Sequence, residues 1–157
     1  MTLDKIDLFF LNHFKKDKSL TTWIPTTVVY SDKELPSWMG GFCRHKVFSN
    51  YIQIATKYKE DEGILRHELT HAKQYGNLFW LHLLLSNFDR YILYIELDAY
   101  REQIKAYNYK NQEDYLWIIE TLISEKYGIN IDYNKVKSCA DYMFKDIIEK
   151  NKRSVKG

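Results

Sequence analysis

Five consecutive residues near the middle of the chain have the types and spacing of a metal-binding hydrolytic centre. They are His67-Glu68-Leu69-Thr70-His71. On a helix, residues four apart are rotated by about 40° and displaced by about 6 Å along the axis, so the two imidazoles point to one side. Such a pair can hold one metal ion. We expect zinc, which accepts nitrogen ligands and lowers the pKa of a water ligand toward about 7.

Glu68 supplies the second half of this chemistry. It is offset from His67 by about 100° around the helix, so its carboxylate lies beside the metal and does not bind it. From there it can take a proton from water as a general base and return it to the leaving amine of a peptide bond. The motif therefore predicts a zinc-dependent peptidase that acts on a peptide or protein substrate. Two histidines on an ordinary helix are the alternative, and their spacing around a glutamate argues against coincidence.

A catalytic zinc site normally has three protein ligands, so one more must come from elsewhere in the chain. The sequence here resembles the gluzincin class of zinc peptidases. Its His-Glu-Leu-Thr-His run is similar to that of the thermolysin family. The later segment Glu96-Leu97-Asp98-Ala99-Tyr100 is similar to the Glu-x-Glu-Ala-Asp segment of intramembrane prenyl-protein peptidases. The resemblance covers roughly residues 50 to 105, and its first motif is the more specific.

The resemblance implies that Glu96 is the third zinc ligand. Tyr100 stands where those families have an acidic residue that orients a metal-bound histidine, so the support of that histidine differs here. Two rival ligands remain. His82 lies in an apolar run, where packing beside the core is the simpler explanation, and Asp98 is rotated by about 160° from Glu96. The metzincin class is excluded, because it would need glycine at position 74 and histidine at position 77.

Peptidases of this class often add a side chain that stabilises the oxyanion. The candidates are His45, Tyr91, Tyr94 and Tyr100, and in a chain with 13 tyrosines the sequence does not choose among them. The resemblance also implies that a sheet precedes the motif helix and that its edge strand pairs with extended substrate. Residues 51–56 are placed to be that strand, although a purely structural place in the core would explain them equally well.

The surrounding elements must position these residues, and periodicity and turn signals indicate where they lie. In chain order we expect a helix over 1–18, strands over 26–30, 42–48 and 51–56 with a turn at 49–50, and helices over 60–76, 88–107, 112–127 and 133–150. Residues 86–87 would cap the second of those later helices. These elements predict an α+β fold, a small antiparallel sheet packed on a mainly helical, zincin-like body, with the zinc between the motif helix and the Glu96 helix.

Composition limits the number of domains and the classes of partner that the chain can have. The 157 residues fit one domain, which we predict to be a zincin-like metallopeptidase domain over 1–157. A net charge of +2 gives no strong field for nucleic acid or anionic membrane, and neither is expected as a partner. The longest apolar stretch, Leu78–Leu85, is much shorter than the roughly 20 residues that span a bilayer. The oligomeric state stays open.

Two cysteines and a charged N-terminus indicate the compartment. Cys43 and Cys139 lack the paired spacing of a thiolate zinc site or a redox couple, and the first 18 residues lack the uncharged core of a signal peptide. Both features predict a reducing, cytoplasmic location. A non-catalytic function is the alternative to peptidase activity: zinc as a structural cross-link, or a regulator that binds a partner. A structural zinc site needs no general base, so Glu68 favours the peptidase.

Overall fold

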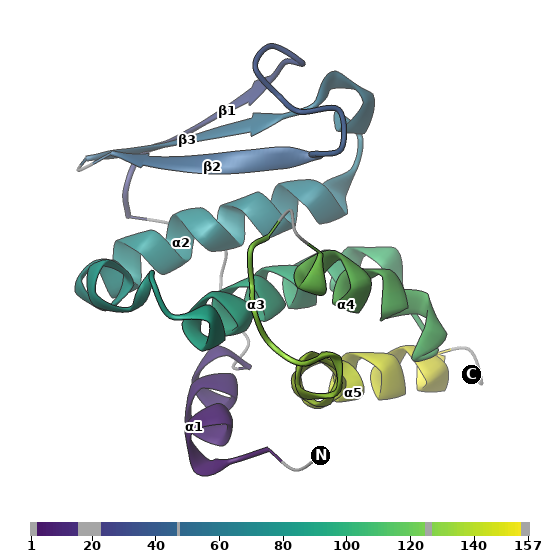
Figure 1. The fold of residues 1–157 in the computed structure, drawn as a ribbon. Helices are drawn as coiled ribbons and strands as arrows, with labels where there is room; N and C mark the ends of the chain where they lie inside the picture. The colour runs from purple at the N-terminus through teal and green to yellow at the C-terminus, as the bar shows by residue number, and fades with distance from the viewer. Residues whose placement is uncertain (1–2, 16–22, 47, 125–126, 155–157) are drawn as a thin grey trace.

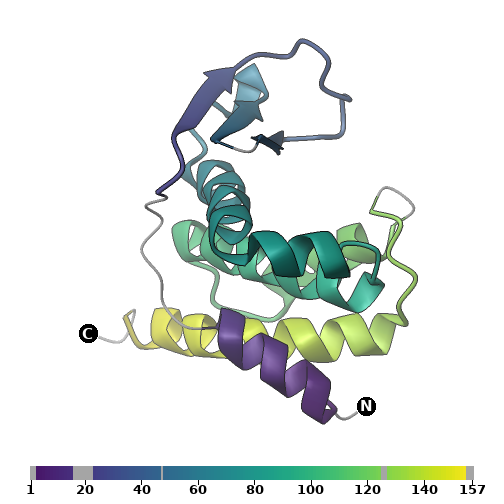
Figure 2. The ribbon, with the colours of Figure 1, turned by 90° about the vertical axis from the view of Figure 1, so that its left-hand side faces the viewer.

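A small sheet lies on a larger helical body in the computed structural model, which describes residues 3–15, 23–46, 48–124 and 127–154. The chain has the predicted α+β fold. Its elements, in chain order, are α1 (Lys5–Phe14), β1 (Thr26–Tyr30), β2 (Gly41–Lys46), β3 (Ser49–Ile54), α2 (Glu62–Leu85), α3 (Asp89–Tyr107), α4 (Leu116–Ile123) and α5 (Tyr133–Ser154), with 3-10 turns at Thr56–Tyr58 and Glu113–Tyr115. The sheet covers one side of α2, and the other helices lie beyond its opposite side (Figures 1 and 2).

The sheet is mixed, with the strand order β1-β3-β2. β2 and β3 pair antiparallel, as predicted, whereas β1 pairs parallel to β3, with Thr26 opposite Asn50. The prediction of a purely antiparallel sheet is therefore wrong for β1. The reason is the connection over residues 31–40, which is long enough to carry the chain to the far edge before β3 returns between the two earlier strands.

β3 is the central strand, paired on both sides. The prediction that residues 51–56 form an edge strand for substrate is therefore wrong. β2 lies next to α2, and one of its two edges is unpaired within the described residues. Ile52 and Ile54 are fully buried and pack with Ala72 of α2 in a small core cluster. Leu65 and Leu69 contact this cluster, so they anchor the motif helix against the sheet.

α2 begins close to its predicted start and ends later than predicted. The side chain of Asp61 caps its first turn by accepting a hydrogen bond from the backbone N–H of Ile64, 3.1 Å away. The helix continues through Gly76 to Leu85. A Cβ at Gly76 would lie 3.3 Å from the indole nitrogen of Trp23. The glycine there allows the segment before β1 to lie close to the helix and does not terminate it.

The larger hydrophobic core lies among α1, α3, α4 and α5. Its fully buried members include Leu11, Leu93, Leu97, Ile104, Ile118 and Met143. α3 is the element shared by both halves of the molecule, because it packs on α2 along one side and on α1 and α5 along the other (Figure 1). Glu96 is therefore held by a helix that is largely buried, with contacts on both sides.

A buried cluster of charges attaches α1 to this body. Asp7, fully buried, accepts hydrogen bonds of 2.6 Å from both Tyr94 Oη and Arg90 Nη2, and it pairs with Lys135 Nζ of α5. Burial acts to raise the pKa of Asp7, but the hydrogen bonds from Lys135, Tyr94, the Asp4 backbone and Arg90 outweigh it and hold the pKa well below its usual range. The carboxylate is thus fully satisfied in its charged form.

Several predicted element ends differ from the structure. α3 starts at Asp89, with Phe88 at its N-cap and no capping side chain, so the predicted cap at 86–87 is wrong. α4 is shorter than the predicted helix over 112–127: it follows a 3-10 turn and ends where Ser124 becomes extended. Residues 1–2, 16–18 and 125–126 of the predicted helices, and Val47 of the predicted second strand, lie outside the described residues. No helix in the described ranges is long and apolar enough to cross a membrane.

Candidate metal centre

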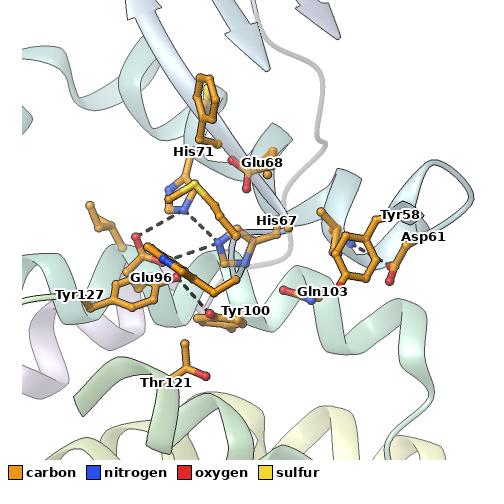
Figure 3. Close-up of a pocket in the computed structure, with 18 of the residues that line it drawn as sticks. Tyr58, Asp61, His67, Glu68, His71, Glu96, Tyr100, Gln103, Thr121 and Tyr127 are labelled. Atoms are coloured by element: carbon orange, nitrogen blue, oxygen red, sulfur yellow. Dashed lines mark hydrogen bonds and ion pairs between the residues drawn. The ribbon is translucent and has the colours of Figure 1, made fainter. Parts of the chain in front are cut away.

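α2 and α3 bring His67, His71 and Glu96 together, as predicted (Figure 3). The two Nε2 atoms are 3.1 Å apart, Glu96 Oε2 is 3.6 Å from His67 Nε2, and Glu96 Oε1 is 3.5 Å from His71 Nε2. A tetrahedral zinc ion with bonds of about 2.0–2.1 Å has ligand atoms about 3.3 Å apart. The three separations therefore match one face of a tetrahedral site.

Local structure explains this convergence. His67 and His71 are one turn apart on α2, so both rings project from the same side of the helix. The short connection over residues 86–88 folds α3 back against α2, and the two helices share the most extensive contact in the molecule. Glu96 lies on the side of α3 that faces the two histidines. The ligand set thus comes from two helices packed over much of their length, which makes the centre rigid.

A hydrogen-bond relay fixes the orientation of His71. The side-chain amide of Gln74 donates to the Ile95 carbonyl and to Asp98 Oδ2, both at 2.9 Å. Its oxygen therefore faces His71 and accepts the Nδ1 proton over 2.9 Å. A neutral imidazole protonated on Nδ1 carries its lone pair on Nε2, the atom that faces the other two candidate ligands. The relay prepares that atom to bind a metal.

Asp98 takes part in the site through this relay. Asp98 is buried. Among the described residues, the candidate metal ligands that lie close together are His67, His71 and Glu96, and this set contains neither Asp98 nor His82. Position 100 holds tyrosine where the resembling families have an acidic residue that orients a histidine. Here the Asp98 carboxylate orients His71 instead, through Gln74. His82 lies in the wall of the same cleft but outside the ligand group.

An unsatisfied carboxylate oxygen at the centre favours a cation. Within the described residues, the buried atom Glu96 Oε2 has no hydrogen-bond partner, and such atoms normally find one. His67 Nδ1 also has none, but it is not the ring nitrogen that faces the other candidate ligands. Burial lowers the pKa of His71, but the charges of Glu96 and Glu68 and the hydrogen bonds that the ring donates to Glu96 and Gln74 raise it to about 9. Although burial opposes it, the two histidines hold the pKa of Glu96 below its usual range. The two carboxylates therefore stabilise positive charge at this point, whether it is a second proton on His71 or a metal ion that replaces this proton.

Glu68 is a buried carboxylate without a hydrogen-bond or ion-pair partner in the part of the chain that the structure describes. Its side chain is 5% exposed, and no hydrogen bond or ion pair joins it to any described residue. Burial raises its pKa and Glu96 adds to the effect, while His67 and His71 lower it in part. A desolvated carboxylate with free lone pairs beside a metal site has the properties of a general base.

Gly41 allows β2 to pass close over Glu68. A Cβ at this position would lie 2.9 Å from the Gln53 carbonyl oxygen and 3.1 Å from Glu68 Oε1. Any larger residue would displace the carboxylate or the strand. Sequence reasoning did not assign this role, although the pair Gly40-Gly41 before a strand was a usable signal of close backbone approach.

A cleft of about 690 Å³ opens between β2 and helices α2, α3 and α4. Its walls include His67, Glu68, His71 and Glu96, so the candidate ligands and base all face the same space (Figure 3). Tyr127 from the segment after α4 also lines it. The cleft has the size of a site for a small ligand or a short length of peptide.

The four oxyanion candidates differ in whether they line the cleft. Tyr91 and Tyr94 do not line the cleft, whereas His45 and Tyr100 do. Tyr100 lies edge-on to the His67 ring, with 4.5 Å between centroids. Its hydroxyl is 3.0 Å from that of Tyr127, which sequence reasoning missed. Burial raises the pKa of both phenols, so both stay protonated, and a pair that shares one hydrogen bond keeps one proton free to donate.

His45 is held against α2. Its ring stacks on Tyr75 with 4.0 Å between centroids, and its Nδ1 is 3.0 Å from Asn50 Oδ1. Burial lowers the pKa of His45 and of His82, so both imidazoles are neutral at physiological pH. They form an uncharged wall of the cleft on the side of His71.

Comparisons with protein-family models, with curated proteins and with solved structures gave no match. The gluzincin resemblance stays confined to the two short segments around His67 and Glu96. The function of the centre is therefore inferred from the residues that build it.

Proposed function

We propose that the protein is a zinc-dependent peptidase in which His67, His71 and Glu96 hold the metal and Glu68 is the general base. The observation that carries this proposal is the unpartnered, buried carboxylate of Glu68 beside three ligand atoms spaced as one face of a tetrahedron. A zinc ion held there would polarise a peptide carbonyl and make water more acidic. A site that used zinc only as a cross-link would have no use for such a base.

The residues around the proposed ligands have separate roles in the proposed reaction. Glu68 takes a proton from water and later gives it to the leaving nitrogen, and its raised pKa helps it to hold the proton between these steps. Gln74 and Asp98 keep His71 in the tautomer that presents Nε2 to the metal. The Tyr100–Tyr127 pair offers a hydroxyl proton toward the cleft, where a developing oxyanion would need a donor.

The free edge of β2 is the place where we expect an extended substrate to pair. The Gly40 carbonyl accepts a hydrogen bond from the N–H of Ala55, which makes these two residues a hydrogen-bonded pair of the β2–β3 ladder. Alternate residues then turn their N–H and C=O groups away from β3, and these are Gly41, Cys43 and His45. All three line the cleft. A peptide added here would run past Glu68 and the ligands.

The cytoplasm is the compartment that fits this proposal. Cys43 and Cys139 are both free thiols in the fold, and burial raises the pKa of each to about 12. Neither is therefore activated as a nucleophile or metal ligand at neutral pH. Free, inert cysteines are typical of proteins that work in a reducing environment.

Metal analysis combined with Glu68→Gln tests the proposal. We expect one zinc per chain by elemental analysis. Glu68→Gln should keep that zinc and lower the hydrolysis of casein or of a quenched peptide library by at least about 100-fold, because the proton acceptor is lost. Glu62→Gln is the matched control: it removes an exposed carboxylate from the same helix and should leave both values unchanged.

Two outcomes would contradict the proposal. If Glu68→Gln were as active as the parent chain, Glu68 would not be the base. If the parent chain bound zinc but cut no peptide, the alternative of a non-catalytic zinc-binding regulator would replace the peptidase.

A further inference from the structure

The end of the cleft around Asp61 has the chemistry of a site for a positively charged side chain. We propose that it binds a lysine or arginine of the substrate, about three residues from the bond that is cut. This proposal rests on the proposed function of the cleft as a peptide site. It names the class of substrate: polypeptide segments that carry a basic residue at this distance.

Asp61 offers its carboxylate to the cleft without a cationic partner. It caps α2 by accepting from the Ile64 N–H, and it accepts from Tyr107 Oη at 2.9 Å (Oδ1) and 3.0 Å (Oδ2). Among the described residues, no lysine, arginine or histidine pairs with it. The side chain is only half-buried and lines the cleft. Lone pairs of a charged carboxylate thus remain available to a ligand.

The position of Asp61 is fixed by contacts from α3. Gln103 Nε2 donates to Tyr107 Oη at 2.9 Å, so the phenol uses its own proton for Asp61. Gly63 makes this arrangement possible, because a Cβ there would collide with the Tyr107 ring. A glycine within a helix costs conformational entropy. Here it lets an aromatic ring lie against the first turn and hold the carboxylate at the cleft wall.

The charge of the whole cleft favours the same ligand. Its described walls contain the three carboxylates of Asp61, Glu68 and Glu96 and no lysine or arginine. Glu68 is buried, unpartnered and directed into this space. Beside Asp61, the rings of Tyr58 and Tyr107 provide apolar walls for the methylene stem of a long basic side chain. Beside Asp61, an acidic side chain would meet the like charge of the Asp61 carboxylate.

The distance from Asp61 to Glu68 sets where the basic residue must stand. The two residues are seven apart along α2, which places them two turns from each other on one side of the helix, about 10 Å apart. Figure 3 shows Asp61 and Tyr58 at one end of the pocket, with His67 and Glu68 between them and Glu96. An extended peptide rises about 3.3 Å per residue, so about three residues separate the basic side chain from the bond beside Glu68.

Binding measurements test the site without relying on hydrolysis. The zinc-loaded Glu68→Gln chain would be titrated with fluorescein-labelled ten-residue peptides with blocked ends, and binding followed by anisotropy. The peptides carry lysine, norleucine or glutamate at one position at a time. We expect lysine to bind about fivefold more tightly than norleucine at one position, the ratio given by about 1 kcal/mol for a half-exposed charge pair. Glutamate should bind more weakly than either.

Two variants in the same background locate the effect. Asp61→Asn keeps an N-cap of equal quality and still accepts from Tyr107, but it removes the charge. In this variant, the lysine and norleucine peptides should bind with about equal affinity. Glu62→Gln removes one charge from the adjacent residue, whose exposed carboxylate pairs with Arg66 and does not line the cleft. That variant should keep the preference.

The outcomes separate this inference from the proposed function. Equal binding of lysine and norleucine peptides, an unchanged preference in Asp61→Asn, or no measurable binding of any peptide would overturn the basic-residue site. If basic peptides bind through Asp61 but the chain with native Glu68 cuts none of them, the site stands and the peptidase proposal fails. If the chain hydrolyses peptides without any preference for a basic residue, the peptidase proposal stands and the basic-residue site fails.

Discussion

Asp7 and Glu68 are both buried carboxylates, but their surroundings differ in every other respect. Asp7 lies between α1, α3 and α5 and receives hydrogen bonds from two cations and a phenol. Glu68 lies between β2 and α2 and receives none from any described residue. The first environment lowers the carboxyl pKa and the second raises it. The comparison shows that a buried charge with hydrogen-bond partners holds elements of the fold together, whereas one without described partners is the stronger candidate for the proposed chemistry.

The largest effect that separates the two regions should come from Asp7→Asn. Removing one member of a buried ion cluster leaves Lys135 and Arg90 without their main partner, and such changes cost about 3–5 kcal/mol. We expect the lower end, about 3 kcal/mol, because Asp4 remains beside Arg90. Urea unfolding of the variant measures this loss. Glu68→Gln should not destabilise the chain, and an equal loss in both variants would break the comparison.

The next effect concerns the metal. Glu96→Ala removes a proposed ligand and should weaken zinc binding by more than about 100-fold, which is more than the loss of a residue that only supports a ligand causes. Asp98→Asn acts only through Gln74 and should weaken it by about 10- to 100-fold. Competition with a fluorescent zinc chelator gives both values. The reverse ranking would show that Asp98, and not Glu96, binds the metal.

The smallest effect is a difference in the pH dependence of stability, measured on metal-free protein between pH 3 and 6. The folded-state pKa of Asp7 lies below its unfolded value of about 3.9, so its stabilisation is present above that pH and is lost as the pH falls. The folded-state pKa of Glu68 is raised, so its contribution to stability decreases as the pH rises above about 4.3. Asp7→Asn should flatten the acid side of the stability curve, and Glu68→Gln should steepen it. Identical slopes in the two variants would contradict the assigned shifts.

Helical periodicity was enough to predict that His67 and His71 lie together at the centre, because their four-residue spacing fixes a common side on any regular helix. Glu96 was predicted only from the resemblance of its segment to a known family. The support of His71 could not be predicted in the same way. The contact of Gln74 with Asp98 depends on how α3 is rotated against α2, and a sequence pattern carries no such angle.

The fold was predicted in class and less well in detail, for similar reasons. Gly76 has the composition signal of a helix end, but a tertiary contact with Trp23 explains it. The strands were located from their residues, yet their order was not, because pairing partners are chosen by connections and packing. Tyr127 and Gly41 reach the centre from distant parts of the chain, so no local pattern could have placed them there.

The parallel pairing of β1 has a consequence for how the protein assembles. β1 contacts only β3 within the sheet, so it cannot pair until β3 is available. On a ribosome, the first strand must therefore wait for more than twenty further residues to emerge, as the register of Thr26 with Asn50 requires. The β2–β3 hairpin that carries Gly41 is joined by local contacts, whereas the pairing of β1 closes a loop of more than twenty residues.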